Sequence, residues 1–299
     1  MVNMLRMDFY RLMRSKSFWI ILGCCVVLAI ISVASTSYLL SSDFFESMQA
    51  ALASSSSTGM QFGVSVGPSG SSNMSAEEMA QSIAQAEAMI TTMSQAGFAG
   101  NVMLNGGGLA TLFVVFIAIF YAGEFETGYS KNIFTAQPNR FIFFAARFVE
   151  IIVLALVFTV VSLGSTLLCV MVSGLGLAAT PIVDLFAWFG LVTLGLAAFG
   201  MATVLVVWLT RKMAAGIVVG ILLSAGVVGM LLQGILSLIP SIPGLINYTL
   251  YSCMKALSTG TDVLHATVGI GAAHIAITAL CFLVLYAALS FVVIKKKDI

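Results

Sequence analysis

Few residues of this 299-residue chain have types and spacings that could do chemistry. The two histidines are His265 and His274, and the carboxylate nearest to them in the sequence is Asp262. A zinc-protease helix needs two histidines one turn apart beside a glutamate, and a hydrolase triad needs a serine and a carboxylate around one histidine. These residues build neither site, so we expect no catalytic residues and no enzyme. His274 is expected at a membrane interface, although a position lining a cavity stays open.

Two glycine patterns come close to nucleotide-binding motifs. Gly123 and Gly128 have the spacing of a phosphate-binding loop, but Tyr129 stands where that loop has its lysine. Gly174 and Gly176 imitate a dinucleotide fingerprint, yet they follow a long apolar run in place of a strand. We therefore expect the chain to bind no nucleotide cofactor.

The five cysteines show no CxxC spacing, so neither a disulfide framework nor a metal site is predicted. We expect small buried hydrophobes, as free cysteines usually are. Those within apolar runs are Cys24, Cys25, Cys169 and Cys281, whereas Cys253 lies in a predicted outer loop.

Composition dictates the elements that hold these residues. Hydrophobic residues make up 60% of the chain and charged residues only 8%, with a mean hydropathy of +1.08. Because a soluble domain carries about 25% charged residues, a soluble enzyme, a disordered chain and a nucleic-acid binder are excluded. Apolar runs of about 20 residues match the thickness of a bilayer. The sequence predicts an all-α polytopic membrane protein, with residues 1–299 as one domain.

Six runs are continuously apolar, whereas a barrel strand alternates, so six transmembrane helices are predicted. The runs cover residues 18–40, 107–123, 151–173, 185–209, 213–239 and 268–294. Lys and Arg placement gives the orientation. All of the 13 basic residues except Lys255 fall at one set of ends: Arg6, Arg11, Arg14, Lys16, Lys131, Arg140, Arg147, Arg211, Lys212, Lys295, Lys296 and Lys297. The positive-inside rule then places both termini in the cytoplasm, with the chain in a plasma membrane of bacterial type.

Three segments outside the runs have a character of their own. Residues 3–17 form an amphipathic pattern that predicts a helix at the membrane interface. The long outer loop 41–106 is acidic, lacks Lys and Arg, and contains a predicted helix near 75–96. That helix either packs against protein or captures a cationic or amphipathic substrate. Residues 240–266 contain two prolines, which are consistent with a broken helix.

The cytoplasmic loop 124–147 is the most informative stretch. Glu124 and Glu126 end the second run, and Gly128 is able to end its helix. Pro138 is suited to open the next helix. Between them there is room for a short helix along the membrane surface. The pattern therefore predicts a rigid helical segment on the cytoplasmic side.

Two helical spacings predict contacts between side chains. Arg147 and Glu150 are three residues apart and are expected to pair on one helix face. Gly216, Gly220 and Ser224 form a ridge of small residues that another helix can approach closely. Packing within the chain and a contact between two subunits both stay open for this ridge.

The basic stretch Met-Asp-Phe-Tyr-Arg-Leu-Met-Arg-Ser-Lys-Ser-Phe-Trp before the first span resembles the entry of type-two ATP-binding-cassette exporter permeases. The stretch Glu-Phe-Glu-Thr-Gly-Tyr-Ser-Lys-Asn, followed by Pro-Asn-Arg, is similar to their signature after the second span. Many relatives have Thr where this chain has Tyr129. Six spans, a long first outer loop and a basic tail fit the same family.

The resemblance implies two permease subunits, as a homodimer or a heterodimer, working with two separate ATPase subunits that bind ATP and Mg. Segment 126–138 would dock into the ATPase, and the turn at 211–212 would make a smaller contact. Segment 240–266 would form outer or re-entrant helices. The implied coupling residues are Glu124, Glu126, Gly128, Lys131, Asn132, Pro138, Arg140, Arg211 and Lys212. Spans with so little charge suit an amphipathic or hydrophobic cargo such as a drug, lipid or antimicrobial peptide. The alternatives are an ion-driven secondary transporter or channel, and a membrane scaffold or sensor that transports nothing.

Overall fold

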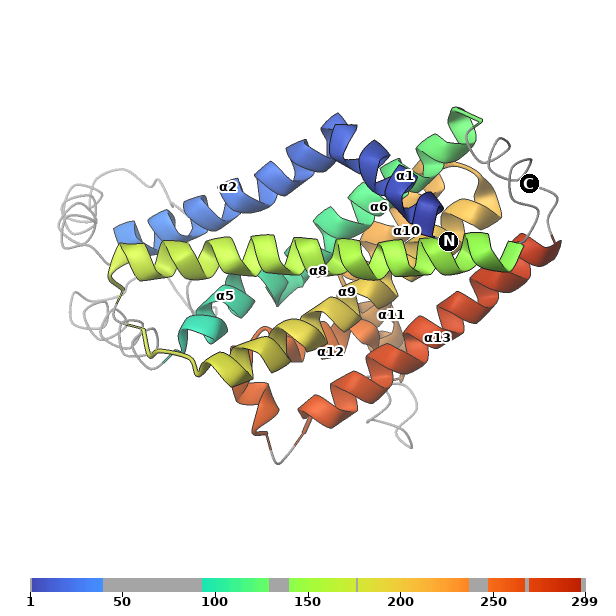
Figure 1. Cartoon of the computed structure of the whole chain (residues 1–299). Coiled ribbons are helices and arrows are strands. Elements are labelled where there is room, and N and C mark those ends of the chain that lie inside the picture. The colour runs from blue at the N-terminus through green and yellow to red at the C-terminus, as the bar shows by residue number, and fades with distance from the viewer. Residues whose placement is uncertain are drawn as a thin grey trace, which may run out of the picture.

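The described residues of this computed structural model are 2–39, 93–128, 140–175, 177–236, 247–266 and 269–296. They form a bundle of helices (Figure 1). The α-helices are α1 (Val2–Arg14), α2 (Lys16–Leu39), α5 (Gln95–Leu104), α6 (Gly108–Glu126), α8 (Arg140–Ser173), α9 (Ile182–Thr210), α10 (Met213–Ser224), α11 (Val227–Leu236), α12 (Leu250–Leu257) and α13 (Ala272–Lys296). Two 3-10 turns, η2 (Asn105–Gly107) and η4 (Gly260–Leu264), complete the described elements.

Within the described residues, five helical segments are long and apolar enough to cross a membrane. They are Lys16–Tyr38, Gln95–Glu126, Arg140–Ser173, Ile182–Thr210 and Ala272–Lys296. Each contains most of one predicted run, so the chain has the helices of a multi-pass membrane protein. The predicted helix at 3–17 is confirmed as α1, which ends at Arg14.

The helix α9 lies at the centre of the bundle, in contact with α6, α8, α10 and α13. In the most apolar 18-residue stretch of α9, 72% of the residues are buried, whereas in the corresponding stretch of α2 only 22% are buried. Small residues such as Ala198 and Gly200 let neighbours approach α9 closely, and the Phe113 ring and the Ile151 side chain occupy the space beside Gly200. The outer helices α2 and α13 instead expose large apolar side chains, as expected of surfaces that face lipid.

The run at 213–239, expected as one continuous span, is divided into α10 and α11. Between them Gly226 has a φ of +78°, which ends α10 without the strain that a side chain would bring. Alone, α10 would cover about 18 Å of a hydrocarbon core about 30 Å thick. The crossing at 213–239 therefore depends on α10 and α11 together, and the count of six spans stays a prediction.

The ridge of small residues on α10 packs within the chain, antiparallel to α6. A side chain at Gly216 would meet Ala118 of α6 and Val207 of α9, and one at Gly220 would lie 3.2 Å from Val114. At the next step the Ser224 and Thr111 hydroxyl groups hydrogen bond at 2.9 Å.

One end of the bundle collects basic residues, and we call it the basic end: Arg11, Arg140, Arg147, Arg211 and Lys295. Here Arg140 Nη1 of α8 donates to the carbonyl oxygens of Ile294 (2.8 Å) and Lys295 (3.0 Å) of α13. The helix α1 and the last turns of α13 both lie at this end (Figure 1). At the opposite end the Trp188 indole of α9 donates to the carbonyl oxygen of Leu257 in α12. The helices α9 and α13 both finish at the basic end. The chain that connects them must therefore run back to the opposite end before α13 begins, and α10 and α11 belong to this connection.

The structure refines several predicted boundaries. Within the predicted cytoplasmic loop 124–147, residues 124–126 belong to the end of α6 and 140–147 to the start of α8, while the side of the membrane on which they lie stays a prediction. The predicted helix near 75–96 reaches too far toward the C-terminus. Ser94 has an extended backbone conformation, and its hydroxyl caps the start of a separate helix, α5. The predicted helix up to residue 92 lies outside the described residues. In the segment 240–266, residues 250–257 form α12 and 260–264 form η4, while 240–246 lie outside the described residues.

The cysteines were expected to be buried, but the structure buries only some of them. Cys25 and Cys253 are buried and Cys169 is half-buried, but Cys24 and Cys281 are exposed. The reason is that α2 and α13 are peripheral helices, with only 22% and 28% of their most apolar stretches buried, so many apolar positions on them face outward.

Candidate functional site

Five charged side chains from three helices meet inside the basic end, and we call them the ionic cluster. They are Asp8 and Arg11 of α1, Glu124 of α6, and Arg147 and Glu150 of α8. Of these, only Arg11 reaches the surface, with 27% of its side chain exposed. A buried charge is tolerated when it is paired and hydrogen bonded, so the cluster is built around its pairings.

Arg147 is the centre of the ionic cluster and is fully buried. Its Nη1 lies 3.0 Å from Asp8 Oδ2 and 2.7 Å from Glu150 Oε2. Its Nη2 lies 2.9 Å from Glu124 Oε1. The predicted pair of Arg147 and Glu150 is thus confirmed, but it is one of three ion pairs made by the same guanidinium group.

Aromatic rings enclose the charged groups. The Arg147 guanidinium lies 5.2 Å from the centroid of the Phe143 ring and 5.6 Å from that of Tyr121. The Tyr121 hydroxyl donates to Glu150 Oε2 at 3.0 Å. Arg11, which also pairs with Glu124, lies 4.4 Å above the Phe120 ring. These walls keep water out and strengthen each interaction between charges.

The cluster holds more acid than base. Two guanidinium groups face three carboxylates, so one negative charge is in excess when all five groups are ionised. Among the described residues, Glu150 Oε1 is buried without a hydrogen-bond partner. Buried ion pairs add little net stability, but removing one partner is costly because it leaves an uncompensated buried charge. The arrangement therefore sets the relative positions of α1, α6 and α8.

The structure gives the implied coupling residues different environments. Glu124 is buried in the ionic cluster, whereas Glu126, in the last turn of α6, is exposed. Gly128 has a φ of +68°, consistent with its predicted role in ending the helix. Lys131, Asn132 and Pro138 lie outside the described residues.

The other implied coupling residues flank the start of α8 and the end of α9. Arg140 is hydrogen bonded to the end of α13. Arg211, with a φ of +55°, caps the end of α9, and Lys212 beside it is exposed.

The ionic cluster and Arg140 anchor the two helices that flank segment 129–139, which itself lies outside the described residues. Before the segment, Glu124 fixes the last turns of α6 to Arg147 and Arg11. After it, Arg140 fixes the first turn of α8 to the end of α13. The ends of α6 and α8 that flank the segment are therefore connected to α1 and α13.

Sequence reasoning missed the part that α1 plays in this site. A signal was available, because Asp8 is the single acidic residue of a basic helix and lies on its inward face beside Leu12. The same reasoning missed the contact at the opposite end between His265 Nε2 and Asp184 Oδ2, which are 3.2 Å apart. His274 lies in the first turn of α13, with Nε2 3.0 Å from the Asn247 carbonyl oxygen, and it lines a pocket of about 410 Å³. Its position at a membrane interface stays a prediction.

Taken together, the long apolar helices and the charge confined to their ends define a helical membrane protein with several spans. No protein-family model matches the chain, and no curated protein matches it.

Proposed function

We propose that the chain is the membrane-spanning subunit of an exporter driven by ATP hydrolysis in a separate ATPase subunit. The observation that supports this is the anchoring of the two helices that flank segment 129–139, α6 by the Glu124–Arg147 pair and α8 by Arg140. A segment that receives force from a partner needs rigid connections to the helices that it moves. Exposed Glu126 and the positive φ of Gly128 are suited to start such a segment.

In this mechanism the chain undergoes a conformational change, and it neither binds nor hydrolyses ATP. ATP and Mg bind to the two ATPase subunits, and closure of these subunits shifts segment 126–138 of each permease subunit. Arg147 passes that shift to α1 and α6, because the same guanidinium group pairs with Asp8 and Glu124. The cavity between two permease subunits then switches between inward and outward access.

The substrate class follows from the spans. Away from the ionic cluster the spanning helices carry few charges, so a strongly charged solute would lose its hydration without compensation. An amphipathic or hydrophobic cargo, such as a drug, a lipid or an antimicrobial peptide, fits this surface. The proposed location is the plasma membrane of a bacterial cell, with both termini in the cytoplasm.

The test replaces Glu126 by Arg and Gly128 by Pro in one variant. We expect the ATPase that co-purifies with the wild-type chain to be lost, together with its ATP hydrolysis. Asp262→Arg is the matched control, because it also places Arg at an exposed carboxylate, but at the opposite end. If the ATPase stays bound to the double variant at the wild-type ratio, segment 126–138 has no coupling role.

One observation favours an ion-driven secondary transporter as the second candidate. Glu150 is a buried carboxylate within α8, bonded to the Tyr121 hydroxyl, and ionisable groups inside a membrane often mark proton paths. Proton flux into liposomes that contain this chain and no ATPase, abolished by Glu150→Gln, would decide for this candidate. Proton-tight liposomes would decide against it.

A further inference from the structure

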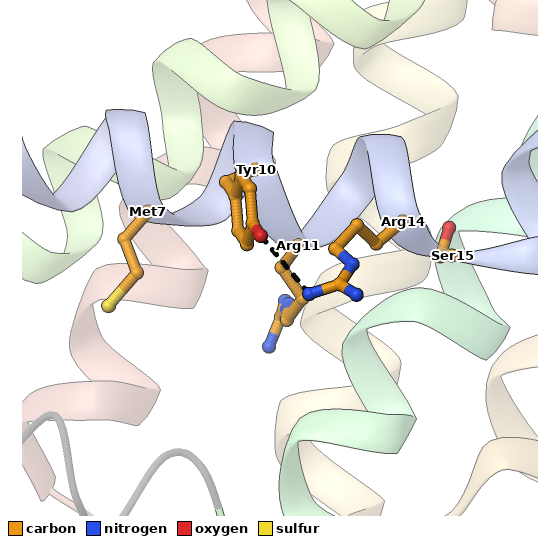
Figure 2. Close-up of a pocket in the computed structure, with 5 residues that line it drawn as sticks. All are labelled: Met7, Tyr10, Arg11, Arg14 and Ser15. Atoms are coloured by element: carbon orange, nitrogen blue, oxygen red, sulfur yellow. Dashed lines mark hydrogen bonds between the residues drawn. The ribbon is translucent and has the colours of Figure 1, made fainter.

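A shallow, open depression lies along the outward face of α1, and we call it the α1 groove. Its volume is about 430 Å³, and it is lined by Met7, Tyr10, Arg11, Arg14 and Ser15 (Figure 2). Tyr10 is 64% exposed, and Met7 and Met13 are also exposed on this helix. The groove therefore combines apolar side chains with two guanidinium groups.

Arg14 is held in place by Tyr10. Its Nη1 donates to the Tyr10 hydroxyl at 3.1 Å, and its guanidinium lies 5.5 Å from the centroid of that ring (Figure 2). Among the residues that the structure describes, no carboxylate forms an ion pair with Arg14. The groove thus presents a positive charge that a negatively charged ligand would neutralise.

The α1 groove lies where the first span begins. Ser15 lies between α1 and α2. Its hydroxyl donates to the Leu12 carbonyl oxygen and accepts from the Phe18 amide. One turn into α2, exposed Trp19 donates its indole N–H to the Met13 carbonyl oxygen. An exposed tryptophan beside basic residues at the start of a span is typical of the layer of lipid headgroups.

We propose that the α1 groove binds the phosphate headgroup of an anionic phospholipid. Guanidinium groups recognise phosphate oxygens through paired charge-assisted hydrogen bonds, and Arg11 and Arg14 both line the groove. Met7 and Trp19 offer apolar surface to the acyl chains. Charge complementarity and the position beside the first span favour a lipid over an acidic protein segment.

Arg11 links the lipid to the interior, because it lines the α1 groove and also pairs with Glu124 in the ionic cluster. A headgroup in the groove shares the Arg11 guanidinium with Glu124, so lipid occupancy alters the cluster that fixes α1 to α6. This inference does not depend on the proposed function, since it needs only a membrane around the chain.

The test is native mass spectrometry of the purified full chain in detergent supplied with phosphatidylglycerol or phosphatidylcholine. We expect the wild type to retain more phosphatidylglycerol than phosphatidylcholine. Arg14→Gln should weaken that retention about five-fold, the factor expected for one basic residue near an anionic surface. Arg211→Gln is the control, because Arg211 is exposed at the same end but outside the groove. Equal melting temperatures of the two variants without added lipid would show that both are folded.

Three outcomes would overturn the proposal. Equal retention of the two lipids by the wild type would mean that the headgroup charge is not recognised. Equal losses in Arg14→Gln and Arg211→Gln would mean general attraction to a basic surface. Release of a bound acidic protein by Arg14→Gln, with phosphatidylglycerol retention unchanged, would assign the groove to that protein.

Discussion

Arg147 of α8 and Glu124 of α6 form a buried ion pair, with 2.9 Å between Nη2 and Oε1. The pair joins the last turns of one candidate span to the first turns of the next. Asp8 bonds to the same guanidinium group, so the N-terminal helix is attached at the same point. The basic end therefore combines buried ion pairs with apolar packing, whereas the middle of the bundle is held by apolar packing.

Arg147→Met should be among the most damaging single substitutions in the chain. It leaves Asp8, Glu124 and Glu150 buried with one cation fewer, a change that typically costs about 3–5 kcal/mol. The free energy of unfolding in detergent, followed by tryptophan fluorescence, measures the loss. The control Arg211→Met removes an exposed Arg and should change stability by no more than about 0.5 kcal/mol.

A second substitution separates charge from packing at Arg147. Adding Glu150→Gln to Arg147→Met removes one of the uncompensated carboxylates, so stability should recover in part. Equal stability of Arg147→Met and Arg211→Met would contradict the ionic cluster as described.

Gly216→Leu should separate α10 from its neighbours. A side chain there overlaps Val207 and meets Ala118 at 3.2 Å, whereas Gly190 of α9 has open space around it. We expect Gly216→Leu to lower stability by about 1–3 kcal/mol, as overpacking commonly does, and Gly190→Leu to have little effect. Thermal unfolding of the two purified variants compares them directly. Equal melting temperatures would show that α10 does not pack against α6 and α9.

Cys253 should react slowly with maleimides. Burial raises the pKa of its thiol to about 11, and only the thiolate attacks. In a variant whose other cysteines are replaced by Ser, the alkylation rate should rise about ten-fold per pH unit from pH 8 to pH 10. A Cys placed at exposed Ala266 should approach its plateau near pH 9. A plateau at that same pH for Cys253 would mean that its thiol is not buried.

Cysteine accessibility also tests the sixth crossing. In a variant without native cysteines, Lys212→Cys and Lys296→Cys should both resist an impermeant maleimide in intact cells, whereas Ser57→Cys in the outer loop should react. Lys212 precedes α10, and Lys296 ends α13. If α10 and α11 failed to cross, positions 212 and 296 would lie on opposite sides of the membrane, and one of them would react.

Local spacing predicted the contacts that a single helix makes, and it could not predict those between distant helices. The pair of Arg147 and Glu150 followed from residues one turn apart on one helix. Glu124 was predicted to end the second run and begin the cytoplasmic loop, and its pairing with Arg147 and Arg11 inside the bundle was not foreseen.

The break in the fifth run escaped prediction for a related reason. Gly226 is one glycine among several in that run, and its sequence neighbours do not distinguish it from the helical Gly220. In the fold the Tyr251 ring occupies the space that a side chain at Gly226 would need, and this contact comes from a distant segment.

Site-specific photocrosslinking tests the central claim most directly. A benzophenone amino acid is placed at Ser130 of the full chain in its native membrane, and its crosslinked partner is identified by mass spectrometry. Tyr248, exposed at the opposite end, is the control position. The proposed function predicts a covalent adduct with an ATPase subunit from Ser130 and none from Tyr248. Crosslinks from Ser130 to lipid alone, or the same ATPase captured equally from both positions, would contradict it.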